Sequence, residues 1–234
     1  MMQRVFTLLI LILFCWGCNK KIDGVGPIVR TQKNVEHFTK IILETEGTLL
    51  IKQGAVQSVT IIAQQNIADA LYTVVQNNRL KIYTDKWLTT DKDIVYEIVV
   101  PQITGMELAG SGKFKTTETI KTSKLDITVS GSGQMEVDVV TNELECDIMG
   151  SGNIAIKGSS NKTDLEISGS GAYHGFECYT ANCDASISGS GLAEVSVSNS
   201  LKASVSGSGV INYTGKPKDV KKSISGSGAV NALN

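Results

Sequence analysis

The residues of this sequence that could carry out chemistry are a few cysteines, two histidines and a set of carboxylates. Beyond the N-terminal region the cysteines are Cys146, Cys178 and Cys183, and the histidines are His37 and His174. Histidines so far apart in sequence suggest no Ser–His–Asp arrangement, and no His or Cys pair has the spacing of zinc ligands. We expect His174 to be a solvated surface side chain, and we predict no catalytic residue and no metal site.

The three cysteines allow two interpretations. Cys146 and Cys183 occupy positions that hold Leu or Ile elsewhere in a repeating pattern, so they fit buried apolar positions. Cys178 and Cys183 could instead close a disulfide around residues 177–182, in an oxidising compartment. The odd number of cysteines and the buried position of Cys183 count against the disulfide.

Acidic residues are the other candidates, because β-helical polysaccharide-active enzymes carry carboxylates on one outer sheet. Catalytic carboxylate pairs stand about 5 to 10 Å apart, a separation that neighbouring strands could provide. The acidic residues here are spread over several periods, as on any solvated sheet. They are Glu136, Asp138, Glu143, Glu145, Asp147, Glu166 and Glu194.

Glycine-rich segments can also bind phosphate or calcium, but these do not have the required neighbours. A nucleotide loop built on Gly110-Ser111-Gly112-Lys113 would need Gly in place of Glu107 and Ser or Thr in place of Phe114. A calcium-binding β-roll needs Asp after the glycines, and none follows any of the seven triplets. We therefore predict no cofactor.

The same glycines define the architecture that must position every other residue. Gly-Ser-Gly occurs seven times, and successive copies are 21, 19, 19, 20, 18 and 19 residues apart. Such a period is typical of a solenoid, in which each repeat buries its apolar face only by stacking on its neighbours. The predicted corner glycines are Gly110, Gly112, Gly131, Gly133, Gly150, Gly152, Gly169, Gly171, Gly189, Gly191, Gly207, Gly209, Gly226 and Gly228.

Apolar and polar residues alternate on both sides of each triplet, which is the pattern of a half-buried strand. Leu108, Val129, Ile148 and Ile167, for example, all stand two places before a triplet. The sequence therefore predicts an all-β fold, a right-handed parallel β-solenoid with two short strands in each turn of about 19 residues. This solenoid is expected over residues 106–234. Its truncated last unit would leave a strand edge on which another copy could pair.

Residues 35–105 are strand-rich but have no Gly-Ser-Gly triplets, and we expect them to form an irregular β-rich cap that continues the solenoid. The expected strands are residues 41–43, 48–51, 58–62, 79–84 and 94–100. Residues 66–76 fit either a short helix or another strand.

The N-terminus has the features of an export signal. Arg4 precedes an apolar run over residues 5–16, which is too short to span a bilayer comfortably. Cys15-Trp16-Gly17-Cys18 is similar to the lipobox of bacterial lipoproteins, although Cys15 and Trp16 depart from the usual pattern. The resemblance implies a signal peptide over residues 1–17 and lipidation of Cys18, which would anchor the protein in a membrane. Gly24, Gly26 and Pro27 suggest that residues 18–34 are a flexible tether.

Composition limits the class of partner. The formal net charge is −1 over 234 residues, and 41% of the residues are hydrophobic. A nearly neutral chain has no electrostatic basis for binding nucleic acid, so we expect no such partner.

Three features together resemble a known family: the lipoprotein start, the segment Tyr96–Pro101 that leads into Gly110-Ser111-Gly112, and the tandem triplets. From about residue 35 to the end, the chain resembles the family named putative auto-transporter adhesin, or head GIN domain. The resemblance implies a β-helical envelope lipoprotein of bacteria, and the family's name suggests adhesion. It supplies no catalytic or binding residues to transfer.

From these observations we expect a non-enzymatic, lipid-anchored protein of the cell envelope, located at the outer membrane. Its repetitive face would bind a glycan or a surface protein. Two alternatives remain at this point: a β-helical polysaccharide-active enzyme, and an envelope scaffold that assembles through uncovered strand edges.

Overall fold

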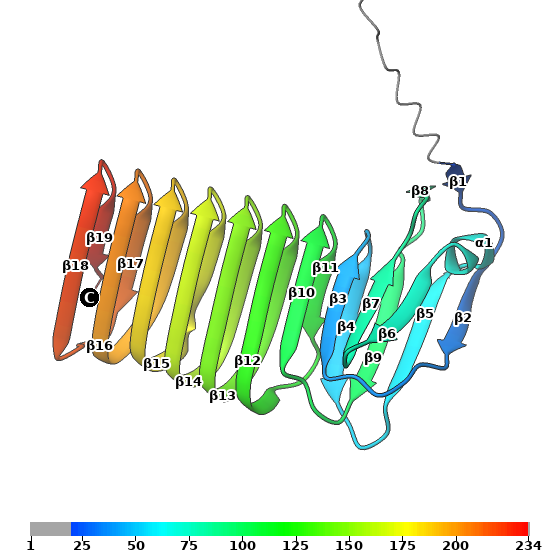
Figure 1. The fold of residues 1–234 in the computed structure, drawn as a ribbon, viewed down its shortest axis with the longest axis horizontal. Coiled ribbons are helices and arrows are strands. Elements are labelled where there is room, and N and C mark those ends of the chain that lie inside the picture. Colours follow the sequence, from blue (N-terminus) through cyan, green and yellow to red (C-terminus); the bar gives the residue numbers. More distant parts are fainter. Residues whose placement is uncertain (1–19, 234) are drawn as a thin grey trace, which may run out of the picture.

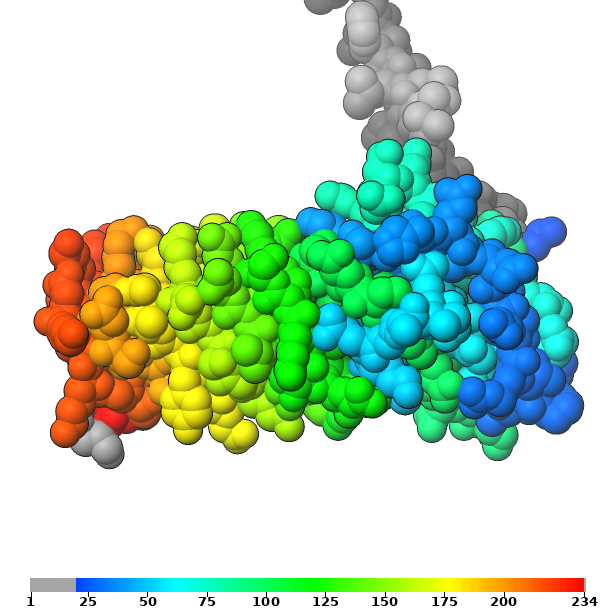
Figure 2. All heavy atoms as spheres, turned by 90° about the horizontal axis from the view of Figure 1, so that it is seen from below, coloured from blue at the N-terminus to red at the C-terminus, as the bar shows by residue number. Residues whose placement is uncertain are grey.

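A computed structural model describes residues 20–233 of the protein as a rod of stacked β-coils (Figure 1). In a space-filling view the sequence colours follow one another along the rod from green to red, and the N-terminal part is bulkier (Figure 2). This order arises because each coil pairs with the coils next to it in the sequence. The prediction of an all-β parallel solenoid is confirmed.

The strands of the regular part begin and end at the triplets. From β12 onward, each strand that enters a corner ends at the first glycine, and the next strand starts directly after the second glycine. The strands are β10 (Gly105–Gly110), β11 (Lys113–Thr116), β12 (Ile120–Gly131), β13 (Gln134–Gly150), β14 (Asn153–Gly169), β15 (Ala172–Gly189), β16 (Leu192–Gly207), β17 (Val210–Thr214), β18 (Asp219–Gly226) and β19 (Ala229–Ala232).

In β13 to β16 the two expected short strands of a coil are joined into one long bent strand. Parallel pairing continues through the second turn, as between Thr141 and Ser160, so that turn does not interrupt the hydrogen-bond ladder. At the Gly-Ser-Gly corner the strand ends, although backbone hydrogen bonds still join the stacked corners, as from the N–H of Ser151 to the carbonyl of Gly131. Each coil consequently contributes one layer before its corner and one layer after it, which we call the pre-corner sheet and the post-corner sheet (Figure 1).

Register between coils is in phase, so that equivalent residues form continuous interior columns. Val129 pairs with Ile148, which pairs with Ile167, and each of these side chains is at most 1% exposed. Stacked apolar columns of this kind remove from water a surface that no single coil could bury.

The corners stack through their backbones. At Gly169 the φ angle is +127°, and a Cβ there would collide with the carbonyl oxygen of Gly150 on the preceding coil. The N–H of the middle Ser170 donates to that same carbonyl oxygen over 2.8 Å. Glycine is therefore required here both by the left-handed backbone and by the close approach of two chains.

The N-terminal part continues the coils without the triplet. β3 (Lys40–Glu44) and β4 (Thr48–Gln53) stack on β10 and β11, and β7 (Arg79–Tyr83) and β9 (Val95–Val100) stack on β3 and β4. Gly47 takes the place of a corner glycine: its φ is +111°, and its carbonyl accepts from the N–H of Lys113 over 2.8 Å.

Antiparallel strands end the stack on the N-terminal side. β6 (Tyr72–Gln76) pairs with β7, β5 (Ser58–Gln64) pairs with β9, and β2 (Ile28–Lys33) pairs with β5. A single turn of helix, α1 (Gln65–Asp69), follows β5 and buries Ile67 and Ala68. Residues 66–76, expected to be either helix or strand, thus contain most of α1 and all of β6.

The expectation of a flexible tether over residues 18–34 is wrong for the described part of that segment. β1 (Lys21–Asp23) pairs with β8 (Trp87–Thr89), and β2 belongs to the main sheet, where Arg30 contacts Glu97 over 2.6 Å. Gly24, Gly26 and Pro27 form the turn between two strands. Glycine and proline occur both in flexible linkers and in turns between strands, so composition could not distinguish the two cases. The predicted signal peptide and the predicted lipidation site Cys18 lie outside the described residues.

Within residues 20–233, the cysteines Cys146, Cys178 and Cys183 lie inside the coils as free thiols. Burial raises the pKa of Cys146 well above its usual range, that of Cys178 to about 11 and that of Cys183 to about 12. The structure therefore supports the apolar interpretation, and Cys178 and Cys183 do not form a disulfide. Within residues 20–233, no helix has the length and apolar character needed to cross a membrane.

Candidate functional site

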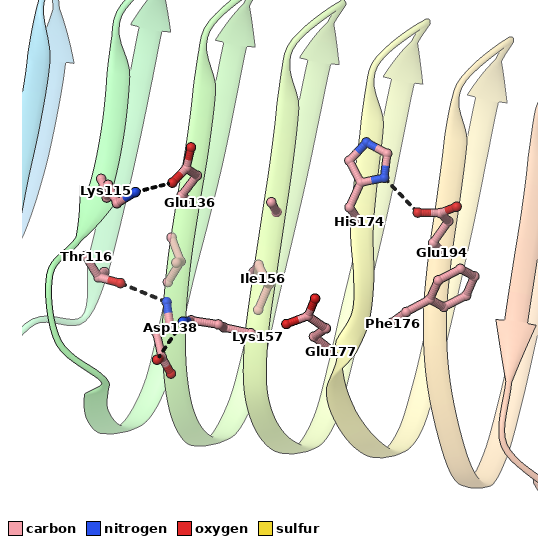
Figure 3. A pocket seen from close by; sticks show the side chains of 12 residues that line it. Lys115, Thr116, Glu136, Asp138, Ile156, Lys157, His174, Phe176, Glu177 and Glu194 are labelled. Atoms are coloured by element: carbon pink, nitrogen blue, oxygen red, sulfur yellow. Dashed lines mark hydrogen bonds and ion pairs between the residues drawn. The ribbon is translucent and has the colours of Figure 1, made fainter.

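A groove of about 430 Å³ lies on the post-corner sheet and extends across β11, β13, β14, β15 and β16 (Figure 3). Five neighbouring coils contribute to it, which corresponds to a length of about 19 Å at the usual strand spacing. Its lining is Lys115, Thr116, Glu136, Val137, Asp138, Ala155, Ile156, Lys157, His174, Phe176, Glu177 and Glu194.

One row of side chains runs along the groove, because residues in register on successive coils point to the same side. Lys115, Glu136, Ala155, His174 and Glu194 occupy this row in order. Lys115 Nζ contacts Glu136 Oε2 over 2.7 Å, and His174 Nδ1 contacts Glu194 Oε2 over 2.7 Å. Ala155 stands in register between Glu136 and His174, so its small side chain separates the two polar pairs.

Strand β15 contains a β-bulge next to this row. Ala155 pairs with His174 but Lys157 pairs with Glu177, so β15 holds one extra residue opposite Ile156. A bulge twists a strand locally and changes the direction of its side chains. Phe176, which lies in this bulge, is partly exposed and forms one side of the groove (Figure 3).

Charges in the groove are arranged in pairs. The hydrogen bond from Lys115 lowers the pKa of Glu136, so this carboxylate is held ionised and is a poor general acid. Lys157 Nζ lies 3.5 Å from Asp138 Oδ2, and the backbone N–H of Asp138 donates to Thr116 Oγ1 over 2.8 Å. Both donors and acceptors are thus presented to a ligand.

A second group of acidic side chains lies on the pre-corner sheet. Burial, followed by the nearby charges of Glu145 and Glu166, raises the pKa of Asp147. Asp126 lies in the same region; burial opposes its ionisation, but hydrogen bonds from Lys40 and Lys124 lower its pKa overall. The acidic residues named in the sequence analysis are therefore divided between two faces instead of meeting at one site.

The groove is a charged outer surface, separate from the buried thiols of the described chain. Within the described part of the chain, no three His, Cys, Asp or Glu side chains are placed to hold a metal ion. The three buried thiols lie inside the coils, where a surface ligand cannot reach them.

The surface position predicted for His174 is correct, and the structure places this side chain in one row with Lys115, Glu136 and Glu194. The bulge and the role of Phe176 were missed. One signal could have revealed them: the triplets that flank β15 are 20 residues apart, whereas the preceding two intervals are 19 residues each. The extra residue in that interval is consistent with the bulge.

The fold and the groove together define the class of this protein, a parallel β-solenoid with glycine corners and a ligand-sized groove on one outer sheet. The chain belongs to the family described as "Putative auto-transporter adhesin, head GIN domain", whose model matches residues 37–217. This description indicates an adhesin-like protein of the cell surface or envelope. The resemblance inferred from the sequence is confirmed.

Solved structures with the same fold are similar over nearly the whole chain. A putative adhesin from Bacteroides fragilis superposes with a TM-score of 0.83 and 23% identity, covering 91% of this chain and 100% of that one. A putative lipid binding protein from Parabacteroides distasonis has a TM-score of 0.78 and 23% identity, covering 92% and 100%. A putative adhesin from the same organism has a TM-score of 0.72 and 25% identity, with the same coverage. No curated protein matches the chain.

Proposed function

We propose that this protein is a non-enzymatic, lipid-anchored protein of the outer membrane that binds an extended glycan along the post-corner groove. The observation that carries the proposal is the groove itself, which presents paired polar side chains and one aromatic ring over several coils. Sugar rings have hydroxyl groups for the former and an apolar face for the latter. The spacing between coils, about 4.8 Å, is also close to the length of one sugar unit.

Adhesion is supported by the family description and by the two neighbours described as adhesins. One neighbour is described as lipid binding, which raises the question of where a ligand would enter this chain. The interior columns are filled by packed apolar side chains such as Ile148 and Ile167. A ligand is therefore best accommodated on the outer groove.

Glycan binding can be tested by titrating purified protein against bacterial and host polysaccharides, with Phe176→Ala as the diagnostic variant. We expect about a fivefold loss of affinity, because a stacked aromatic ring contributes on the order of 1 kcal/mol. Tyr179→Ala is the matched control, since Tyr179 is 70% exposed on the same strand but lies outside the groove lining. It should leave the affinity unchanged.

Two results would contradict the proposal. Equal affinity of the wild-type protein and the Phe176→Ala variant for every glycan bound would show that glycans do not bind in the groove. Binding of an unfolded or extended protein segment in preference to any glycan would show that the ligand is a protein and not a glycan.

Anchorage and exposure are tested in cells. Cys18→Ala should release the protein from the membrane fraction and abolish incorporation of labelled fatty acid.

Protease treatment of intact cells, with lysed cells as control, separates a surface protein from one that faces the periplasm. Protection until lysis would contradict an adhesive role.

The alternative of a polysaccharide-active enzyme has one observation in its favour, the raised pKa of Asp147 beside Glu145 and Glu166. A raised pKa favours the protonated form of the carboxyl group, which is the form that a general acid requires. Glycan cleavage that disappears in Asp147→Asn would establish this alternative.

A further inference from the structure

The two-stranded sheet of β1 and β8 stands apart from the coils, at the N-terminal end of the rod (Figure 1). It is formed where residues 84–94 leave the stack between β7 and β9, at the place where other coils have a short corner. Lys21 pairs with Trp87, and the N–H of Trp87 donates to the carbonyl of Lys20 over 3.3 Å. Trp87 therefore lies directly beside the first described residues.

The sheet has an apolar inner side and an amphipathic outer side. Leu88 is 8% exposed and Ile22 packs against the core, so both face inward. Because strand side chains alternate, their neighbours Lys21 and Trp87 face away from the core. Trp87 is 67% exposed, so its indole ring is available to a partner or to a membrane surface beside the first described residues.

Charges around Trp87 cancel locally. Lys21 contacts Asp23 over 2.7 Å, Lys86 contacts Asp85 over 2.8 Å and Lys92 contacts Asp91 over 3.0 Å. A surface with this balance neither needs anionic lipids nor is repelled by them. It suits the headgroup layer of an uncharged membrane, where Trp is the preferred residue.

The chain between Cys18 and this sheet is too short to hold the sheet far from a membrane. Three residue steps from Cys18 to Lys21 span at most about 10 Å, and the neighbouring strand lies about 5 Å further. Since residues 21–23 and 28–33 are paired strands, the 18–34 segment is not a tether that could lengthen this distance. Anchorage at Cys18 would bring Trp87 within about 15 Å of the lipidated residue.

We propose that the β1–β8 sheet docks on the membrane surface, with Trp87 inserted among the lipid headgroups. This inference rests on the lipid anchorage of the proposed function. The docking fixes the N-terminal end of the rod at the bilayer, so that the solenoid is held close to the membrane and is not separated from it by a flexible linker.

Trp87 can be observed selectively in the mature protein, because the only other tryptophan of the sequence is Trp16, which belongs to the predicted signal peptide over residues 1–17. We would place the lipidated mature protein, beginning at Cys18, in phosphatidylcholine vesicles with or without brominated acyl chains. Docking predicts a blue-shifted emission, quenching by the brominated lipid, and protection from aqueous acrylamide relative to detergent solution. None of these should depend on salt, because the ion pairs leave little net charge.

The matched control moves the single tryptophan to a remote exposed position. In a Trp87→Phe, Tyr179→Trp variant the reporter lies on β15, and we expect no quenching by brominated lipid. Circular dichroism verifies that both proteins keep the same β-fold. Emission of Trp87 that is as accessible to acrylamide in vesicles as in detergent would overturn the inference and leave anchorage intact. Absence of fatty acid on the mature protein by mass spectrometry would overturn both.

Discussion

Single glycines at the corners serve two purposes that can be separated by substitution. Gly110 has a φ of +122° but open space where a Cβ would lie, whereas at Gly169 a Cβ would meet the backbone of Gly150. Both substitutions to Ala strain the backbone, but only the second one also forces stacked coils apart.

We expect Gly110→Ala to lower the free energy of unfolding by about 1–2 kcal/mol, the cost of a residue in a sparsely populated backbone region. Gly169→Ala should lower it by more than about 3 kcal/mol, because a backbone collision is added. Urea denaturation measures both values. Equal losses would show that backbone conformation alone selects glycine at the corners.

The contribution of Asp147 to the free energy of unfolding depends on pH with a definite sign. Its pKa is raised in the folded protein by burial and by neighbouring carboxylates. Ionisation of Asp147 therefore costs more free energy in the folded protein than in the unfolded chain, and it destabilises the fold. This penalty is absent below the ordinary Asp pKa and is fully present above the raised one. Asp147→Asn should therefore increase the urea midpoint at pH 7 and leave it unchanged near pH 3.

Asp184→Asn is the control for this experiment. Asp184 belongs to the same face but contacts Lys202 over 2.7 Å. Its replacement removes an exposed ion pair and should change stability little, in the destabilising direction. An equal increase of the urea midpoint in both variants would show that the net charge of this face, and not the environment of Asp147, determines the effect.

At the scale of elements, the last coil shows how the exposed end of the stack is closed. Lys222 of β18 stands in register with Ala203, at an interior position that holds Met, Ile, Cys, Leu or Ala in the earlier coils. Its Nζ donates to the carbonyl of Val230 on β19 over 2.9 Å and lies 5.2 Å from the ring centre of Tyr213. A charge placed inward on an edge opposes pairing with another chain.

We expect Lys222→Leu to promote association through the β18–β19 edge, measured by sedimentation velocity as a concentration-dependent dimer or larger species. Lys221→Leu adds the same apolar side chain at the neighbouring outward position and should remain at the oligomeric state of the wild type. Identical sedimentation of both variants and the wild type would show that Lys222 does not protect the edge. A wild-type protein that already forms filaments would favour the scaffold alternative.

At the scale of the whole molecule, a stack of coils has contacts only between neighbours, so its stability is nearly one-dimensional. Antiparallel strands and α1 cover the N-terminal end, whereas the residues of β18 are exposed or only half buried, with Ile224 at 46%. The protection of a backbone amide from hydrogen exchange depends on the coils on both sides of it. The covered N-terminal end of the rod should therefore be better protected than the C-terminal end.

Hydrogen exchange followed by mass spectrometry should reveal this gradient. We expect the slowest exchange in β13, β14 and β15, slower than in β12 or β16, and the fastest among the paired strands in β18 and β19. Uniform protection from β12 to β19 would mean that the rod opens as a single cooperative unit.

The sequence by itself determined the repeating architecture, because the glycine period and the alternation around it are local patterns with one stable solution. The interior positions of Ile148, Ile167 and Cys146 and the outward position of His174 followed from counting residues from a corner. The family also followed, because the triplets and the lead-in at residues 96–101 are specific.

Only the tertiary structure decided features that depend on contacts between distant segments. The pairing of β1 with β8 joins residues more than sixty positions apart, so Gly24 and Pro27 looked like parts of a linker. Gly47 acts as a corner because it stacks beneath Gly112, although no repeated triplet marks it. The bulge that places Phe176 at the groove likewise appears only when β15 is stacked on β14, because the extra residue is defined by the register of the two strands.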